Sequence, residues 1–260
     1  MVSAVLVEMH EHVLVAVINR PEAMNAIDGE VSAQLGAALE QADNDRAVRA
    51  FVLTGAGDRA FCAGADLRAL GRGESILAAG HEHWGIGGYM RHPISKPTIA
   101  AVNGLALGGG TELVLASDLA VAASTATFGL PEVARGLFAA AGGAFRLPEQ
   151  LPRKVAMEMI LTGEPITAAR ALEFGLVNRV VPADRVLDTA MELATRIAAN
   201  APLAVQASKR VALGIVDGAL PDHDAWDRSD HEIAELTRSA DVREGLMAFV
   251  EKRSPNWQAR

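Results

Sequence analysis

The hydrophobic period changes repeatedly along the first 180 residues, and this is the strongest constraint on the fold. Apolar residues alternate at period two over residues 5–9 and 13–17, with a polar break between them, which predicts a strand hairpin. Over residues 29–42 the spacing changes to that of an amphipathic helix. Residues 50–54 and 97–102 are again typical of buried strands. Strands that alternate with helices favour a layered α/β fold.

The pattern becomes wholly helical after Ala183, so we divide the chain into a core (1–182) and a helical region (183–260). Asp241 and Glu244 have the spacing of a capping box and predict a last helix over residues 245–252. Leu246, Met247 and Phe249 in that helix would form either an oligomer contact or an intramolecular one.

Composition excludes several classes of protein. Among 260 residues, 50% are hydrophobic and 22% are charged, which is ordinary globular usage and excludes a disordered or collagenous chain. The 24 basic residues against 32 acidic ones give a net charge of -8, which disfavours a nucleic-acid partner.

Cysteine content and hydropathy indicate a cytoplasmic protein. Cys62 is a lone cysteine without a disulfide partner, which fits a reducing compartment. The amino terminus has no basic region of the kind that begins a signal peptide. Polar residues interrupt the apolar segment 98–130 before it is long enough to span a bilayer, so we expect no membrane association.

Two glycine-rich turns each precede a predicted helix, at residues 63–66 (AGAD) and 108–112 (GGGTE). Residues 55–66 as a whole are too rich in glycine for regular structure. Unpaired amides at a helix start can bind an anion or polarise a carbonyl, so the turns could form an oxyanion hole. The alternative is that both are only tight turns. Neither fits a dinucleotide or phosphate-loop motif.

Two carboxylates follow likewise at helix starts. Glu112 stands in the apolar run ELVLA, and Glu132 follows Pro131. They are either exposed partners of a helix dipole or carboxyl groups kept out of water, which can exchange protons near neutral pH. Cys62 is more typical of a small buried residue than of a nucleophile. His81 and His83 lack metal-ligand spacing, and we expect no metal site.

Several motifs together resemble the crotonase family, the enoyl-CoA hydratase and isomerase superfamily, almost from end to end. They are Asn19-Arg20-Pro21 with Asn25-Ala26, residues 61–67 (FCAGADL), 102–118 (VNGLALGGGTELVLASD), 128–143, 173–181 (EFGLVNRVV) and 249–253 (FVEKR).

The resemblance implies a spiral of ββα turns followed by a helical trimerisation region, with trimers that commonly pair into hexamers. It implies that the amides of Ala65 and Gly109 form an oxyanion hole for the thioester carbonyl of an acyl-CoA substrate. It further implies that Glu112 activates the water that attacks the β carbon and that Glu132 delivers a proton to the α carbon. Both positions are glutamate in family members that hydrate a 2-enoyl thioester.

No external cofactor is implied, because coenzyme A enters as part of the substrate. The resemblance places the CoA moiety beside Ala63, Asp66 and Gly108. Local cations would have to bind its phosphates, and the basic candidates are Arg20, Arg68 and Lys252.

Other activities remain open at this point. An isomerase is one, although isomerases of the family typically replace the residue at the position of Glu112. A dehydratase of a specialised acyl-CoA is another, because residues 131–136, 146–152 and 254–257 resemble a carnitinyl-CoA dehydratase-like branch. Residues 137–141 (LFAAA) depart from many hydratases, so the acyl pocket could differ in shape. A scaffold that binds acyl-CoA without turnover is a third possibility.

Overall fold

The structure is a computed structural model that describes residues 3–260, and it confirms the mixed α/β fold. Its main sheet has the strand order β1-β2-β3-β5-β7-β10. The first two strands form the predicted antiparallel hairpin, and every later pair in this sheet is parallel. The strands are β1 Val5–His10, β2 Val13–Ile18, β3 Ala50–Gly55, β5 Thr98–Val102, β7 Leu119–Ala123 and β10 Arg179–Val181.

A smaller sheet has the order β4-β6-β8-β9, and its first three strands pair parallel. The chain passes through it between later strands of the main sheet, as β4 between β3 and β5, as β6 between β5 and β7, and as β8 and β9 between β7 and β10. This repeated route is the spiral that the family resemblance implies. The strands are β4 Ala60–Cys62, β6 Leu105–Leu107, β8 Thr127–Gly129 and β9 Ile166–Thr167.

The expectation that residues 55–66 lack regular structure is wrong at their centre, where β4 lies. All three of its residues are buried, and the strand pairs with β6. Three residues among glycines are too few to show a period, so a distant strand completes what the local sequence does not indicate.

Helix α1 (Gly29–Asn44) confirms the predicted amphipathic segment. Asp28 caps its start, where the side chain accepts a hydrogen bond of 2.9 Å from the Val31 amide. Val31, Leu35 and Leu39 are fully buried in the core cluster with the strands of the main sheet. Burial of each such side chain stabilises the fold by roughly 1.5–3 kcal/mol.

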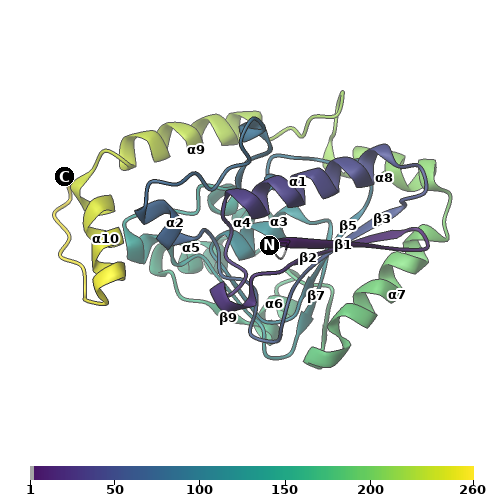
Figure 1. Cartoon of the computed structure of the whole chain (residues 1–260), viewed down its shortest axis with the longest axis horizontal. Coiled ribbons are helices and arrows are strands. Elements are labelled where there is room, and N and C mark those ends of the chain that lie inside the picture. The colour runs from purple at the N-terminus through teal and green to yellow at the C-terminus, as the bar shows by residue number, and fades with distance from the viewer. Residues whose placement is uncertain (1–2) are drawn as a thin grey trace.

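From Ala183 onward the named elements are helices, as the sequence predicts. Figure 1 shows α7 and α8 toward one end of the long axis, α10 with the chain end at the other, and α9 along one side. None of the helices within residues 3–260 is long and apolar enough to cross a membrane. The helices are α2 Leu67–Gly71, α3 Gly109–Ala116, α4 Gly143–Gln150, α5 Arg153–Thr162, α6 Ala168–Glu173, α7 Val186–Ala198, α8 Pro202–Leu213, α9 His223–Leu236 and α10 Ala240–Glu251.

The last helix begins earlier than the capping-box prediction places it. Ser239 caps α10 by accepting a hydrogen bond from the Val242 amide. Asp241 and Glu244 therefore lie inside the helix, where they bind the chain end instead. Asp241 accepts hydrogen bonds from the amides of Gln258 and Ala259, and Glu244 accepts one from the Asn256 amide.

Helix α10 packs closely on the 3₁₀ helix η4 (Pro131–Arg135). Gly245 makes this possible, because a Cβ at that position would overlap the carbonyl oxygen of Arg135. Met247 and Val250 point away from η4 and are exposed in the single chain, and Phe249, whose ring lies beside Arg135 of η4, is 41% exposed. The division at residue 182 stays a prediction, since the helical region is in direct contact with the core.

We expect Gly245→Ala to lower the free energy of unfolding by about 1–3 kcal/mol, because the added methyl forces α10 away from η4. Urea denaturation followed by circular dichroism measures the change. The matched control is Gly71→Ala, also in a helix, where an added Cβ meets open space and should be neutral or slightly stabilising. Equal effects of the two substitutions would contradict the close packing.

Candidate active site

The three parallel strands of the smaller sheet position the site. β4, β6 and β8 lie side by side and end at Cys62, Leu107 and Gly129. The first two lead through the glycine turns into α2 and α3, and the third leads into η4. Because the carboxyl ends of parallel strands share one edge of a sheet, the three following segments converge there.

The two glycine turns touch each other. A Cβ built on Gly109 would lie 3.3 Å from the Gly64 Cα and 3.6 Å from the Ala65 nitrogen. Gly64 has φ +92°, and a Cβ there would lie 2.9 Å from the Leu107 carbonyl oxygen, so only glycine fits this contact. Within residues 3–260, neither the Ala65 amide nor the Gly109 amide donates to a protein acceptor. The structure therefore brings both predicted oxyanion donors together with their N–H groups free.

A buried hydroxyl fixes the second turn to the sheet. Thr111 is fully buried, and its Oγ1 lies 2.7 Å from the carbonyl oxygen of Ala106 in β6. Thr111 Oγ1 also accepts a hydrogen bond of 3.0 Å from the Gly129 amide in β8. The start of α3 is thus tied to both strands, which limits movement of the neighbouring Gly109 amide.

Glu112 lies in the first turn of α3 and is only 3% exposed. Its Oε1 accepts a hydrogen bond of 2.9 Å from the Gly143 amide at the start of α4. Burial raises the pKa of this carboxyl well above its usual range, against the opposing effect of the Gly143 and Ala141 amides and of Arg146. The interpretation of Glu112 as an exposed partner of the helix dipole is therefore wrong.

Glu132 lies in η4, with its carboxyl group directed at the second glycine turn. A Cβ on Gly108 would lie 2.9 Å from its Oε1. Its Oε2 is buried without a hydrogen-bond partner in the described part of the chain. Burial raises the pKa of Glu132 strongly, and the charge of Glu112 raises it further.

The two carboxyl groups form one electrostatic unit. Negative charge on Glu112 disfavours ionisation of Glu132 in this poorly hydrated space, so the state with one proton shared by the pair is favoured. Such a pair can give a proton and take a proton near neutral pH without any other titrating side chain.

Arg20 forms ion pairs with the residues on either side of the first glycine turn's contact with Ile27. Its Nη2 lies 3.0 Å from Asp66 Oδ2 and 3.1 Å from Asp28 Oδ2, the caps of α2 and α1. Between the two caps, Ile27 pairs with Ala65 as a parallel bridge. Burial alone would raise the pKa of Asp66, but the Ala69 amide, the Arg20 guanidinium and the Arg68 amide outweigh it and lower that pKa. The geometry gives Arg20 a role in holding Ala65, and its contact with CoA phosphates stays a prediction.

The other predicted CoA-binding residues lie on different elements. The Ala63 amide donates a hydrogen bond of 3.0 Å to the Met24 carbonyl. Arg68 on α2 is exposed, and so is Lys252, the C-cap of α10. Helix α10 contacts α2, so both cations lie on neighbouring elements. Their roles toward CoA stay predictions.

Sequence reasoning did not assign roles to Gly143, Thr111 or Arg146. Gly143 belongs to a quoted motif, but nothing local indicates that its amide binds Glu112. As expected of a small buried residue, Cys62 is buried, which raises the pKa of its thiol to about 12. His81 and His83 are exposed, and no metal-binding cluster occurs among residues 3–260.

Comparison with known proteins gives one consistent result. A family profile described as enoyl-CoA hydratase/isomerase matches residues 8–260. The carnitinyl-CoA dehydratase of Proteus mirabilis is 40% identical over 254 residues, which cover 95% of each chain. An enoyl-CoA hydratase of Mycobacterium tuberculosis is 40% identical over 260 residues, which cover 98% of this chain and 96% of the other. A crystal structure of carnitinyl-CoA hydratase from Mycobacterium avium is 56% identical, with a TM-score of 0.98 over 100% of both chains.

We expect Glu132→Gln to stabilise the protein above about pH 5. The raised pKa means that ionisation of Glu132 is harder in the folded chain than in the unfolded one, so its penalty is absent below the ordinary glutamate pKa of about 4.3 and grows as pH rises. A neutral amide removes this penalty and should add about 1–3 kcal/mol to the free energy of unfolding at pH 8.

Thermal unfolding at pH 5 and at pH 8 measures this gain. Glu149→Gln is the matched control, because Glu149 is exposed on α4 and has water around it in both states. A gain from Glu132→Gln that is no larger at pH 8 than at pH 5 would contradict the burial of its charge.

Proposed function

The chain belongs to the enoyl-CoA hydratase/isomerase family, and on that premise we propose that it is a hydro-lyase that adds water across the 2,3 double bond of a 2-enoyl-CoA to give a 3-hydroxyacyl-CoA. The observation that carries the proposal is a pair of buried carboxyl groups, Glu112 and Glu132, beside the free amides of Ala65 and Gly109.

The two amides supply the electrostatic part of the reaction. When water attacks the β carbon, negative charge moves through the conjugated system to the thioester oxygen. Free N–H groups that are already fixed in place stabilise this enolate without any reorganisation. The ties from Thr111 to two strands and from Arg20 to two helix caps support such fixed placement.

The carboxyl pair supplies the protons. Glu112 as the anion takes a proton from water while the water oxygen bonds to the β carbon. Glu132 in its protonated form then gives its proton to the α carbon. One proton has been taken and one given, and transfer of a proton from Glu112 to Glu132 restores the starting state.

The same site serves the reverse reaction, and one observation favours it as a second candidate. Several similar proteins are named carnitinyl-CoA dehydratase or hydratase, so a polar acyl group is a reasonable alternative to a plain fatty acyl group. Loss of water from a hydroxylated acyl-CoA passes through the same enolate and uses the same two carboxyl groups. The two candidates differ in substrate, not in mechanism.

Isomerase and scaffold activities are less well supported. Moving a double bond needs one carboxyl group to carry a proton between two carbons, and leaves Glu112 without a task. A scaffold would gain nothing from two buried carboxyl groups whose ionisation costs stability. We propose no external cofactor, because the enolate needs only hydrogen-bond donors and proton transfer. We also propose a cytoplasmic location, in line with the lone buried thiol of Cys62.

The decisive experiment follows the absorbance of the conjugated enoyl thioester when the protein is mixed with crotonyl-CoA and with longer 2-enoyl-CoAs. We expect turnover by the native chain and a loss of at least about 10²-fold in kcat for Glu112→Gln and for Glu132→Gln. Glu149→Gln, at an exposed position of α4, should leave kcat unchanged. A native chain that binds acyl-CoA but hydrates no enoyl-CoA and dehydrates no hydroxyacyl-CoA would overturn the proposal.

We further propose a homotrimer, or a hexamer of two trimers, with α8 in the contact between chains. Its apolar residues are left open to solvent in the single chain, with Leu203 78% and Val211 84% exposed, and no residue of α8 is buried among residues 3–260. Val216, just beyond the helix, is 69% exposed. An apolar helix of this kind is typical of a surface that another subunit covers.

Val211→Asp should reduce the mass of the native oligomer, because it buries a charge in the proposed interface. Sedimentation velocity measures the mass. Leu161→Asp is the control, since Leu161 is an apolar residue of α5 that is 67% exposed. A monomeric native chain, or a trimer that Val211→Asp leaves intact, would contradict the role of α8.

A further inference from the structure

Arg146 is a buried cation that the proposed reaction does not use. It lies in the first turn of α4, and its amide donates a hydrogen bond of 2.8 Å to the Gly142 carbonyl. Its side chain is 9% exposed. The residue is therefore one turn beyond Gly143, whose amide binds Glu112.

The guanidinium of Arg146 joins three segments. Nη1 donates a hydrogen bond of 2.9 Å to the carbonyl oxygen of Met90, and the same atom would lie 3.1 Å from a Cβ on Gly142. Nη2 lies 2.9 Å from Asp222 Oδ2. The cation thus rests on the turn that precedes the Gly143 amide, while its carboxylate partner lies on the side of α9.

Helix α9 holds this arrangement from outside. Asp222 is its N-cap. Trp226, in the first turn of α9, is buried, and the centroid of its ring lies 5.2 Å from the Arg146 Cζ. Ser229 of α9 donates a hydrogen bond of 2.9 Å to the carbonyl oxygen of Ala140, which lies just before the Gly142–Gly143 turn. One face of α9 therefore contacts both the arginine and the segment that leads to Gly143.

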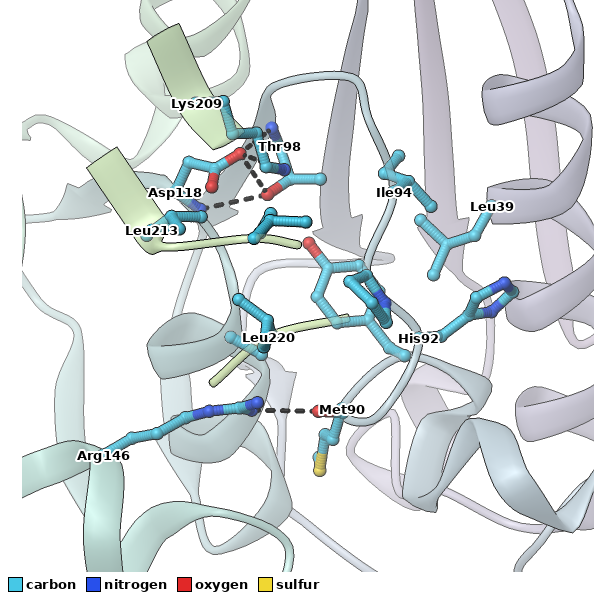
Figure 2. Close-up of a pocket in the computed structure, with 14 residues that line it drawn as sticks. Leu39, Met90, His92, Ile94, Thr98, Asp118, Arg146, Lys209, Leu213 and Leu220 are labelled. Carbon is cyan, nitrogen blue, oxygen red and sulfur yellow. Dashed lines mark hydrogen bonds and ion pairs between the residues drawn. The ribbon is translucent and has the colours of Figure 1, made fainter. Parts of the chain in front are cut away.

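Figure 2 shows Arg146 at one end of a cavity, where it reaches the Met90 carbonyl, with Thr98, Asp118 and Lys209 at the opposite end. Lys209 and Asp118 form an ion pair of 2.7 Å there. The charged and titratable groups near Arg146 are Asp222 on α9, Tyr89, the Arg91–Asp230 pair beside Trp226, Glu112, and His92, Asp118 and Lys209 around the cavity.

We propose that Arg146 is a positioning residue of this site, which through its anchor on α9 holds the Gly142–Gly143 turn against Glu112 and keeps Glu112, rather than Glu132, as the anion of the carboxyl pair. Only the effect of Arg146 on catalysis rests on the proposed function, and its effect on the ionisation of Glu112 does not. Its direct support is that Arg146 Nη1 packs against Gly142, the residue before the amide that binds Glu112, whereas the Oε2 of Glu132 has no hydrogen-bond partner within residues 3–260. Arg146 also lowers the pKa of Glu112, although burial has the larger, opposite effect.

The test titrates Glu112 directly by ¹³C NMR of protein labelled at the glutamate side-chain carboxyl carbon. It uses a Glu132→Gln background, so that one carboxyl of the pair titrates. Arg146→Met removes the charge and keeps the length, and should raise the midpoint of Glu112 by about 0.5–1 pH unit. Asp222→Asn removes the neutralising charge but keeps an amide oxygen that can accept the Arg146 hydrogen bond, so the anchor remains and the midpoint should fall. Arg146→Lys keeps the charge and should stay nearer the native value than Arg146→Met.

A second readout uses the chain with Glu132 present. The acid limb of the pH profile of kcat/KM should move upward in Arg146→Met, so that its loss of rate is partly recovered at higher pH. A merely structural role would lower the rate equally at all pH values.

Opposite shifts in Arg146→Met and Asp222→Asn support the proposal. An unchanged midpoint in folded Arg146→Met, or a midpoint in Asp222→Asn that does not fall, overturns it. If Arg146→Met does not fold, a downward shift in Asp222→Asn supports the proposal, and an unchanged or upward midpoint overturns it. The NMR titration needs no substrate, so a native chain that hydrates nothing would defeat the proposed function and leave the role of Arg146 decided separately.

Discussion

The pairing of three short parallel strands determines where the chemistry lies. β4, β6 and β8 have three residues each, and each ends directly before a segment of the site. Their parallel pairing places the Ala65 turn, the Gly109 turn and Glu132 along one edge, although 67 residues separate Ala65 from Glu132 in the sequence. Glycine at position 64 lets the two turns approach each other closely. Glycine at position 108 lets the carboxyl group of Glu132 approach the second turn. A side chain at either position would separate groups that the proposed reaction needs together.

The site is assembled at a cost to stability. A buried glutamate without a partner is unfavourable as an anion, and a second glutamate nearby makes it more so. The surrounding structure offsets this cost by fixing everything else: Thr111 ties α3 to two strands, and Arg20 links two helix caps across the Ile27–Ala65 bridge. Within residues 3–260, the Ala65 and Gly109 amides and the Oε2 of Glu132 have no protein partner, and a polar reacting centre would satisfy them.

Much of this could be predicted from the sequence, and the remainder could not for physical reasons. Hydrophobic period located the hairpin and α1, which are long enough to repeat their patterns, and continuous apolar runs located β3 and β5. Motif resemblance singled out the amides of Ala65 and Gly109 and both glutamates, which the structure brings together and whose roles stay predictions. No local signal shows β4, whose three residues are stabilised by a partner more than 40 residues away. The same holds for the amide of Gly143 on Glu112, a contact across 31 residues. At α10 a local signal was present but misleading. Asp241 and Glu244 have capping-box spacing, yet they bind the chain end rather than the helix start.

The helical region after residue 182 is more than an appendage to the core. Helix α10 rests on η4 through Gly245, and η4 carries Glu132. Helix α9 contacts the turn before Gly143 through Ser229 and holds Arg146 through Asp222, and that turn binds Glu112. Each of the two carboxyl groups is therefore held in part by one helix of this region. It follows that a disturbance of α9 or α10 would reach the carboxyl pair directly, so that proton transfer in the proposed reaction depends on the helical region as well as on the core.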